Sequence, residues 1–222
     1  MRENTLARLR RWRTLQVMYG TPFDQAARQV YLAHRDGETR VGPLVELAFA
    51  VYECGGRGRA TRELLERPSV ELTSADLVRL GGSLLAEAGF EPGFDLEPTW
   101  WTTLEKALAV VEHDVRVAGV AGDLRLVIPD WAAEFGQAWV EFRGGCHGQG
   151  IDPSFGSRAD GALEIVAEAV QEVVMETIWT VWPVCPDHRT GTHVGSARGH
   201  AIWVCRASRG HTIALVGEFP AR

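Results

Sequence analysis

The stretch that decides the C-terminal part of the fold is residues 160–188, DGALEIVAEAVQEVVMETIWTVWPVCPDH. Apolar residues in its first part recur three and four positions apart, which predicts an amphipathic helix with one buried face from Asp160 to about Val181. Its last part brings Cys185 and His188 within three positions, a spacing typical of zinc ligands. We therefore expect a long helix that leads into a metal-binding turn.

A second face of the same helix is acidic. Glutamates occupy every fourth position, at Glu164, Glu168, Glu172 and Glu176. Like charges at this spacing repel one another, which favours a solvent-exposed stripe. A carboxylate-bridged metal centre is not expected, because such helices carry a Glu-x-x-His pair and this one has none.

The chain beyond this turn offers further metal ligands. Cys205 follows His188 after 16 intervening residues, and the segments around it alternate in polarity as strands do. Zinc requires four ligands in a tetrahedron, of which Cys185, His188 and Cys205 supply three. The fourth is either His211 or His193. We slightly favour His211, because it lies across a short turn from Cys205.

The clustering of these ligands predicts the kind of site. Four of the seven histidines and two of the four cysteines lie within residues 185–222. Their surplus favours structural zinc, because a catalytic zinc keeps one position open for water or substrate. We therefore predict a zinc-ribbon-like β-hairpin over residues 183–219.

The same tail resembles the C-terminal part of a set of uncharacterised bacterial proteins. The resemblance rests on W-P-x-C-P-x-H at 182–188, A-x-W-x-C at 201–205 and V-G-E-F at 216–219, and it reaches back to the run V-I-P-D-W at 127–131. It implies that the fourth ligand is the histidine matching His193. It implies no activity.

The remaining sequence predicts an α+β protein with a helical region over residues 1–92 and an α+β region over 93–222. Helices are expected over 5–19, 21–35, 44–53, 59–67 and 73–89, followed by a linker over 91–98. Thr21 before Pro22 is the expected N-cap of the second helix, and Thr73-x-x-Asp76 resembles a capping box that opens the fifth. Thr102-x-x-Glu105 predicts a capping box that opens a helix to about His113. Alternating apolar residues over 115–128 predict a β-hairpin, and 138–142 a further strand.

Composition and charge limit the classes of function. The net charge is −6, with eight arginines against four acidic residues in 1–40 and five against two in 183–222. The acidic excess therefore lies in the centre, which argues against general nucleic-acid binding. The sequence contains no run of 18 apolar residues, so no membrane span is expected. Four cysteines, two of them at metal-binding spacing, favour a cytoplasmic protein.

One loop resembles a catalytic site. Four glycines between 144 and 150 surround Cys146 and His147, and Asp152 follows. A thiolate activated by a histidine is a nucleophile, with Asp152 or Asp160 as the orienting group. Neighbouring residues of a strand point to opposite faces, however, so an ordinary connecting loop is the favoured interpretation.

We therefore expect a non-catalytic protein-interaction or regulatory protein that binds a protein partner and can form a homodimer. The first alternative is a biosynthetic or modifying enzyme that uses the loop from Cys146 to Asp152. The second alternative is nucleic-acid binding through the basic tail, at Arg189, Arg198, Arg206 and Arg209.

Overall fold

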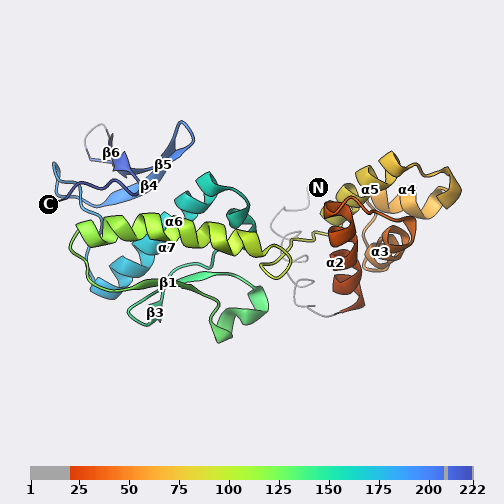
Figure 1. Cartoon of the computed structure of the whole chain (residues 1–222), viewed down its shortest axis with the longest axis horizontal. Coiled ribbons are helices and arrows are strands. Elements are labelled where there is room, and N and C mark those ends of the chain that lie inside the picture. The colour runs from red at the N-terminus through yellow and green to blue at the C-terminus, as the bar shows by residue number, and fades with distance from the viewer. Residues whose placement is uncertain (1–20, 208–209, 222) are drawn as a thin grey trace, which may run out of the picture. The chain divides into compact units, whose positions relative to one another are not determined.

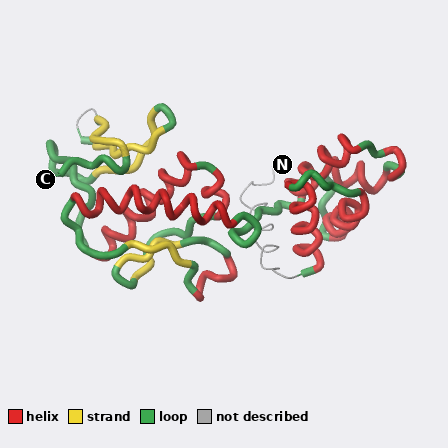
Figure 2. Tube along the Cα trace, viewed as in Figure 1, coloured by secondary structure: helices red, strands yellow, loops and turns green. Residues whose placement is uncertain are grey.

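The computed structural model describes residues 21–207 and 210–221, and the chain divides into two compact units, residues 1–92 and 93–222. The helix expected over 5–19 lies outside the described residues. The first unit is helical, and the second combines helices with two antiparallel sheets, so the expected α+β class is confirmed (Figures 1 and 2).

The first unit packs four described helices around an apolar core. They are α2 (Pro22–Arg35), α3 (Val41–Glu53), α4 (Arg59–Glu66) and α5 (Ser74–Glu87), with the short 3-10 helix η1 (Ser69–Glu71) before α5. The largest fully buried side chains of this core are leucines: Leu44, Leu47, Leu80 and Leu84. The predicted cap of α2 is confirmed, because the hydroxyl of Thr21 accepts from the backbone N–H of Asp24.

The capping box of α5 is also confirmed, with Thr73 and Asp76 bonded to each other's backbone N–H groups. Helix α4 has Gly58 at its N-cap, which offers no side chain to cap the helix. A side chain distant in the sequence accepts hydrogen bonds from its first backbone N–H groups instead. The carboxylate of Glu87 accepts from the backbone of Ala60 at 2.8 Å and of Thr61 at 2.9 Å. Burial acts to raise the pKa of Glu87, but these hydrogen bonds outweigh it and lower the pKa.

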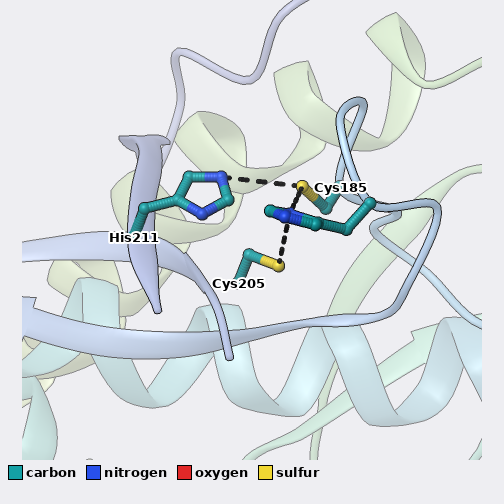
Figure 3. A group of neighbouring side chains, drawn as sticks. Cys185, Cys205 and His211 are labelled. Carbon is teal, nitrogen blue, oxygen red and sulfur yellow. Dashed lines mark hydrogen bonds between the residues drawn. The ribbon is translucent and has the colours of Figure 1, made fainter. Parts of the chain in front are cut away.

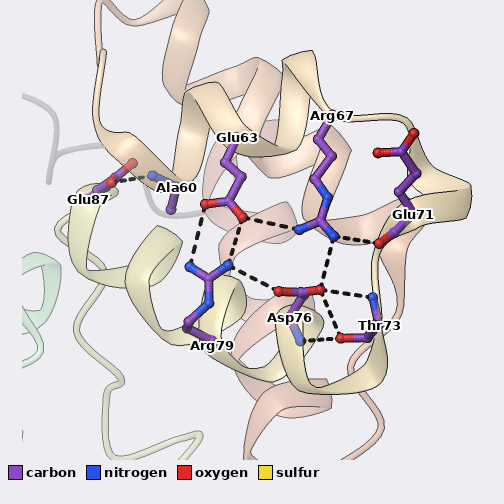
Figure 4. A network of polar contacts seen from close by, with 8 residues as sticks. All are labelled: Ala60, Glu63, Arg67, Glu71, Thr73, Asp76, Arg79 and Glu87. Carbon is purple, nitrogen blue, oxygen red and sulfur yellow. Dashed lines mark hydrogen bonds and ion pairs between the residues drawn. The ribbon is translucent and has the colours of Figure 1, made fainter.

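Charged side chains connect α4 to α5 on the surface (Figure 4). Arg79 contacts Glu63 at 2.7 Å and Asp76 at 3.3 Å, while Arg67 contacts Asp76 at 3.4 Å. Hydrogen bonds from the backbone and hydroxyl of Thr73, together with Arg79, lower the pKa of Asp76. The side chains are partly exposed to water, so the network orients the helices more than it stabilises them.

The second unit has three layers (Figure 1). Helices α6 (Pro98–Val117) and α7 (Ala159–Ile178) lie side by side between two three-stranded antiparallel sheets. One sheet has the order β1-β2-β3, formed by Leu124–Val127, Trp139–Phe142 and Gly145–Cys146. The other has the order β4-β5-β6, formed by Thr192–Ala197, His200–Cys205 and His211–Leu215. Two 3-10 helices, η2 (Asp130–Phe135) and η3 (Pro153–Ser157), connect these elements.

The helix pair supplies most of the core of this unit. The buried face of α7 is the predicted one, and Val166, Val170, Val173 and Val174 have no exposed surface. They pack in one cluster with side chains from α6 and from both sheets. Among the described residues, no helix combines the length and the apolar composition that crossing a bilayer requires.

Two predictions for the region around α6 are wrong. The capping box at Thr102 is not formed, because α6 begins earlier, at Pro98 after the N-cap Glu97. The hairpin expected over 115–128 is also absent: Val115 belongs to α6, and β1 pairs with β2 instead. The reason is that the helical spacing of Leu104, Leu108, Val111 and Val115 continues through this region and outweighs the short alternation at its end.

Candidate metal centre

The first pair of candidate ligands lies on a tight turn between α7 and β4. Val184 and Gly191 form an antiparallel bridge that closes the turn. Inside it, the backbone N–H of Cys185 donates to the carbonyl of Thr190 at 2.8 Å, and that of Arg189 donates to the carbonyl of Cys185 at 2.9 Å. Folding the chain back in this way brings Cys185 and His188 to one side of the turn.

The second pair lies at the adjoining ends of two strands. Cys205 is the last residue of β5 and His211 the first of β6, and the two are direct partners across the ladder. Side chains of directly opposed residues lie on the same face of a sheet. The sheet therefore presents one thiol and one imidazole together.

These two pairs converge on one point (Figure 3). The Nδ1 atom of His188 lies 3.6 Å from the sulfur of Cys185 and 3.6 Å from that of Cys205. The Nε2 atom of His211 lies 3.7 Å from the sulfur of Cys185. One ligand atom from each of the four residues falls within 4.8 Å of all the others, close enough to hold a metal ion.

Burial differs between the two kinds of ligand. Both cysteines have no exposed surface, whereas His188 is exposed and His211 half-buried. The group thus has a protein-covered thiol side and an imidazole side near the surface. Asp187 lies on the open side, with a carboxylate oxygen 3.7 Å from Nε2 of His211.

The environment of Cys205 favours its thiolate. Desolvation acts to raise the pKa of Cys205, but hydrogen bonds involving the Thr190 hydroxyl, the backbone N–H of Ala207 and the Cys185 thiol together lower it. The hydroxyl of Thr190 lies 3.6 Å from the sulfur. A lowered thiol pKa suits metal binding, because the thiolate is the form that coordinates metal ions.

A buried carboxylate holds this sheet on the helix pair. Asp114 of α6 is fully buried and accepts from the indole N–H of Trp203 on β5 at 2.7 Å. It also accepts from the backbone N–H groups of Gly217 at 2.7 Å and Phe219 at 2.9 Å. Three donors satisfy the carboxylate and tie the chain after β6 to α6, which fixes the position of β5 and so of Cys205.

A second polar side chain fixes the turn. The amide of Gln171 on α7 donates to the carbonyls of Trp182 at 3.0 Å and Thr192 at 2.7 Å, on either side of the candidate ligands Cys185 and His188. Sequence reasoning missed both Asp114 and Gln171. The available signal was a polar residue within an otherwise apolar helical face, since such residues are buried only when paired.

The structure separates the two histidines considered for the fourth position. His211 belongs to the four-residue group. His193 lies on β4 opposite Val204, is exposed and lies outside the group. The slight preference for His211 agrees with this geometry, and the assignment implied by the resemblance does not.

The glycine-rich loop does not bring its candidate residues together. Arg143 and Gly144, both with positive φ, form a two-residue hairpin turn between β2 and β3. The first residues of the loop, Gly144 to Cys146, therefore belong to a β-hairpin. Asp152 accepts from the amide of Gln137 at 2.7 Å. Among the described residues, no hydrogen bond links Cys146, His147 and Asp152.

The thiol of this loop also lacks activation. Burial, with a smaller contribution from Glu141, raises the pKa of Cys146. A nucleophilic cysteine requires the opposite shift, because its thiolate is the reactive form. The geometry and electrostatics of the loop therefore give no support to the enzyme alternative.

Comparison with protein-family models, curated proteins and solved structures gives no match to this chain.

Proposed function

We propose that residues 183–219 form a zinc-ribbon-like module, held by one structural Zn²⁺, in a non-catalytic protein-interaction or regulatory protein. The observation on which this proposal rests is the convergence of Cys185, His188, Cys205 and His211 from a turn and from two strand ends. With two ligands on the turn and two at the strand ends, one ion can join these separate segments of the chain.

The distances support zinc. Zinc–sulfur bonds of about 2.3 Å and zinc–nitrogen bonds of about 2.0 Å at a tetrahedral angle place sulfur and nitrogen about 3.5 Å apart. Three of the four sulfur–nitrogen separations in the group are 3.6, 3.6 and 3.7 Å, and the fourth is no more than 4.8 Å. Two thiolates and two imidazoles are also the donor set that favours zinc over the oxygen-seeking magnesium or calcium.

The number of ligands supports a structural role. Four protein side chains complete a tetrahedron and leave no position for a water or a substrate. The ion would then connect the turn after α7 to the ends of β5 and β6, segments joined otherwise by a small three-stranded sheet. A sheet of this size gains much of its stability from such a staple.

An interaction role is the function that fits a closed metal site and an unactivated loop thiol. Large apolar side chains are exposed on the second unit, among them Trp131 and Trp179. Tryptophan is enriched at the centres of protein interfaces. These features support binding to another protein, which affinity purification of host-cell proteins on the zinc-loaded chain would test.

The direct test of the metal module is zinc content by mass spectrometry of untagged, reduced protein. We expect about one zinc per chain, as one tetrahedral site requires. The variants Cys205→Ser and His211→Ala should lose the ion and melt at lower temperature. His193→Ala is the matched control, because it removes an exposed histidine of the same sheet, and it should keep both zinc and stability.

Two outcomes would overturn the proposal. One is the absence of zinc from wild-type protein purified and supplemented with zinc under reducing conditions. The other is an equal loss of zinc in His193→Ala and His211→Ala, which would mean that the four-residue group is not the ligand set.

A further inference from the structure

The connection between β1 and β2 exposes an unusual density of large apolar side chains. Over residues 128–136, Ile128 is 41% exposed, Trp131 61% and Phe135 58%. We call these three residues the aromatic patch. Most of the segment is the 3-10 helix η2, whose C-cap is Gly136 with φ 61°. Together the three side chains expose roughly 300 Å² of apolar surface, an amount comparable with that of surface patches that are often functional.

The patch has a defined, supported geometry. Ala132, in the middle of η2, is 1% exposed and anchors the helix to the unit. Trp131 packs edge-to-face against Trp139 of β2, with ring centroids 4.7 Å apart. An indole ring that is already held in place loses little side-chain entropy when a partner covers it. Trp131 is therefore suited to be the anchor of an interface.

The segment that carries the patch is negatively charged. Asp130 and Glu134 lie within η2 next to the two aromatic residues, both are exposed, and residues 128–136 contain no basic residue. In the part of the chain that the structure describes, neither carboxylate is seen in an ion pair. An apolar centre with an acidic rim is complementary to a ligand with an apolar centre and a basic rim.

This charge also weighs against other occupants. A symmetric dimer through the patch would bring Asp130 and Glu134 of one copy against those of the other, because a twofold interface pairs the same surface with itself. Nucleic-acid phosphates and anionic lipid headgroups would be repelled in the same way. A basic, apolar protein segment is the occupant that satisfies both the aromatic side chains and the carboxylates.

We propose that the aromatic patch, with Asp130 and Glu134, docks a segment of another protein in which arginine or lysine accompanies large apolar residues. This rests on the proposed interaction role and names the surface and the partner chemistry for it. The patch is smaller than the roughly 800 Å² per partner of a standard stable interface, so the complex forms and dissociates readily, with micromolar affinity.

The test is fluorescence anisotropy of a labelled 18-residue peptide of leucine and arginine at helical spacing, titrated with the zinc-loaded full chain. We expect micromolar binding and at least tenfold weaker binding to the double variant Trp131→Ala, Phe135→Ala. Charge reversal, Asp130→Lys with Glu134→Lys, should weaken it similarly. Trp179→Ala is the matched control, because that tryptophan is 87% exposed elsewhere in the unit, and it should bind as wild type does.

Several results would overturn the inference. They are equal affinity of the aromatic double variant and wild type, equal affinity for a leucine–glutamate peptide, or a concentration-dependent dimer that Trp131→Ala abolishes. Zinc content is measured on every sample, so the two proposals fail separately. A zinc-loaded chain that does not bind the peptide refutes the patch, and a zinc-free chain that binds it refutes the metal module.

Discussion

Replacement of Asp114 tests how the sheet that carries Cys205 and His211 is held on the helix pair. Alanine at this position leaves the indole N–H of Trp203 and the backbone N–H groups of Gly217 and Phe219 without their acceptor. Removing one partner of a buried, hydrogen-bonded charge costs about 3–5 kcal/mol, and we expect a loss of unfolding free energy in that range.

The asparagine variant gives a graded result. Oδ2 of Asp114 accepts from Trp203 and Gly217, and Oδ1 accepts from Phe219. The amide oxygen of asparagine can keep the first two bonds, but its NH₂ group then faces the N–H of Phe219. We therefore expect Asp114→Asn to lose about 1–3 kcal/mol, less than alanine does.

Urea unfolding followed by tryptophan fluorescence measures this difference, because seven of the eight tryptophans lie in residues 93–222. Glu112→Ala, on the same helix, is the control. Its carboxylate pairs with the exposed Arg116 at 3.2 Å, and removing it should change the free energy by no more than about 0.5 kcal/mol. If Asp114→Ala and Glu112→Ala lost the same amount, the reasoning about the buried carboxylate would be refuted.

Three further predictions concern other sites. The pKa of Glu87 is lowered in the folded protein, so its contribution to stability is complete above the unfolded pKa and disappears as pH falls through the lower folded pKa. Glu87→Gln should therefore flatten the pH dependence of the melting temperature in this acid range, measured by circular dichroism of the helices. A zinc chelator should add Cys185 and Cys205 to the thiols that react quickly with Ellman's reagent, whereas the exposed Cys54 should react without it. Gly122→Ala should lower the free energy of unfolding by about 2–3 kcal/mol in the same urea assay, because the φ of Gly122 is 140° and a Cβ would lie 2.5 Å from the buried ring of Phe142. Gly119→Ala should lower it by only about 1 kcal/mol, because Gly119 has φ 78° but open space around its Cβ position.

The sequence predicted best what depends on local spacing. The buried face of α7 follows from apolar residues three and four apart, and the cap at Thr21 and the box at Thr73 follow from residue types within one turn. Cys185 and His188 are recognisable for the same reason, because they lie in one short turn. Fold class and the position of the metal group could thus be predicted without the structure.

The fourth candidate ligand could not be decided from spacing, because it depends on strand register. On β4, Thr192 is the partner of Cys205, and His193 faces Val204 instead. A slip of one residue would exchange the two and turn His193 to the other face. On β6 the register, with its irregularity at Trp203 and Val204, places His211 opposite Cys205.

The partners of the supporting polar residues could not be predicted either, because they are distant in the chain. Gln171 bonds carbonyls 11 and 21 residues away, and Glu87 caps a helix that begins 28 residues before it. No local pattern in the sequence indicates which helix end or which loop such a side chain will reach. Only the packed arrangement of the elements brings these groups together.

The bonds of Asp114 also constrain the order in which the second unit folds. Its three donors follow it by 89, 103 and 105 residues, so at about 5–20 residues per second a ribosome delivers them several seconds after α6. During that interval the carboxylate stays hydrated, and the valines of α7 that β4 and β5 will cover remain exposed. Docking of the tail is then the late, long-range step that expels this water, and we expect the chain to be most prone to aggregation just before it.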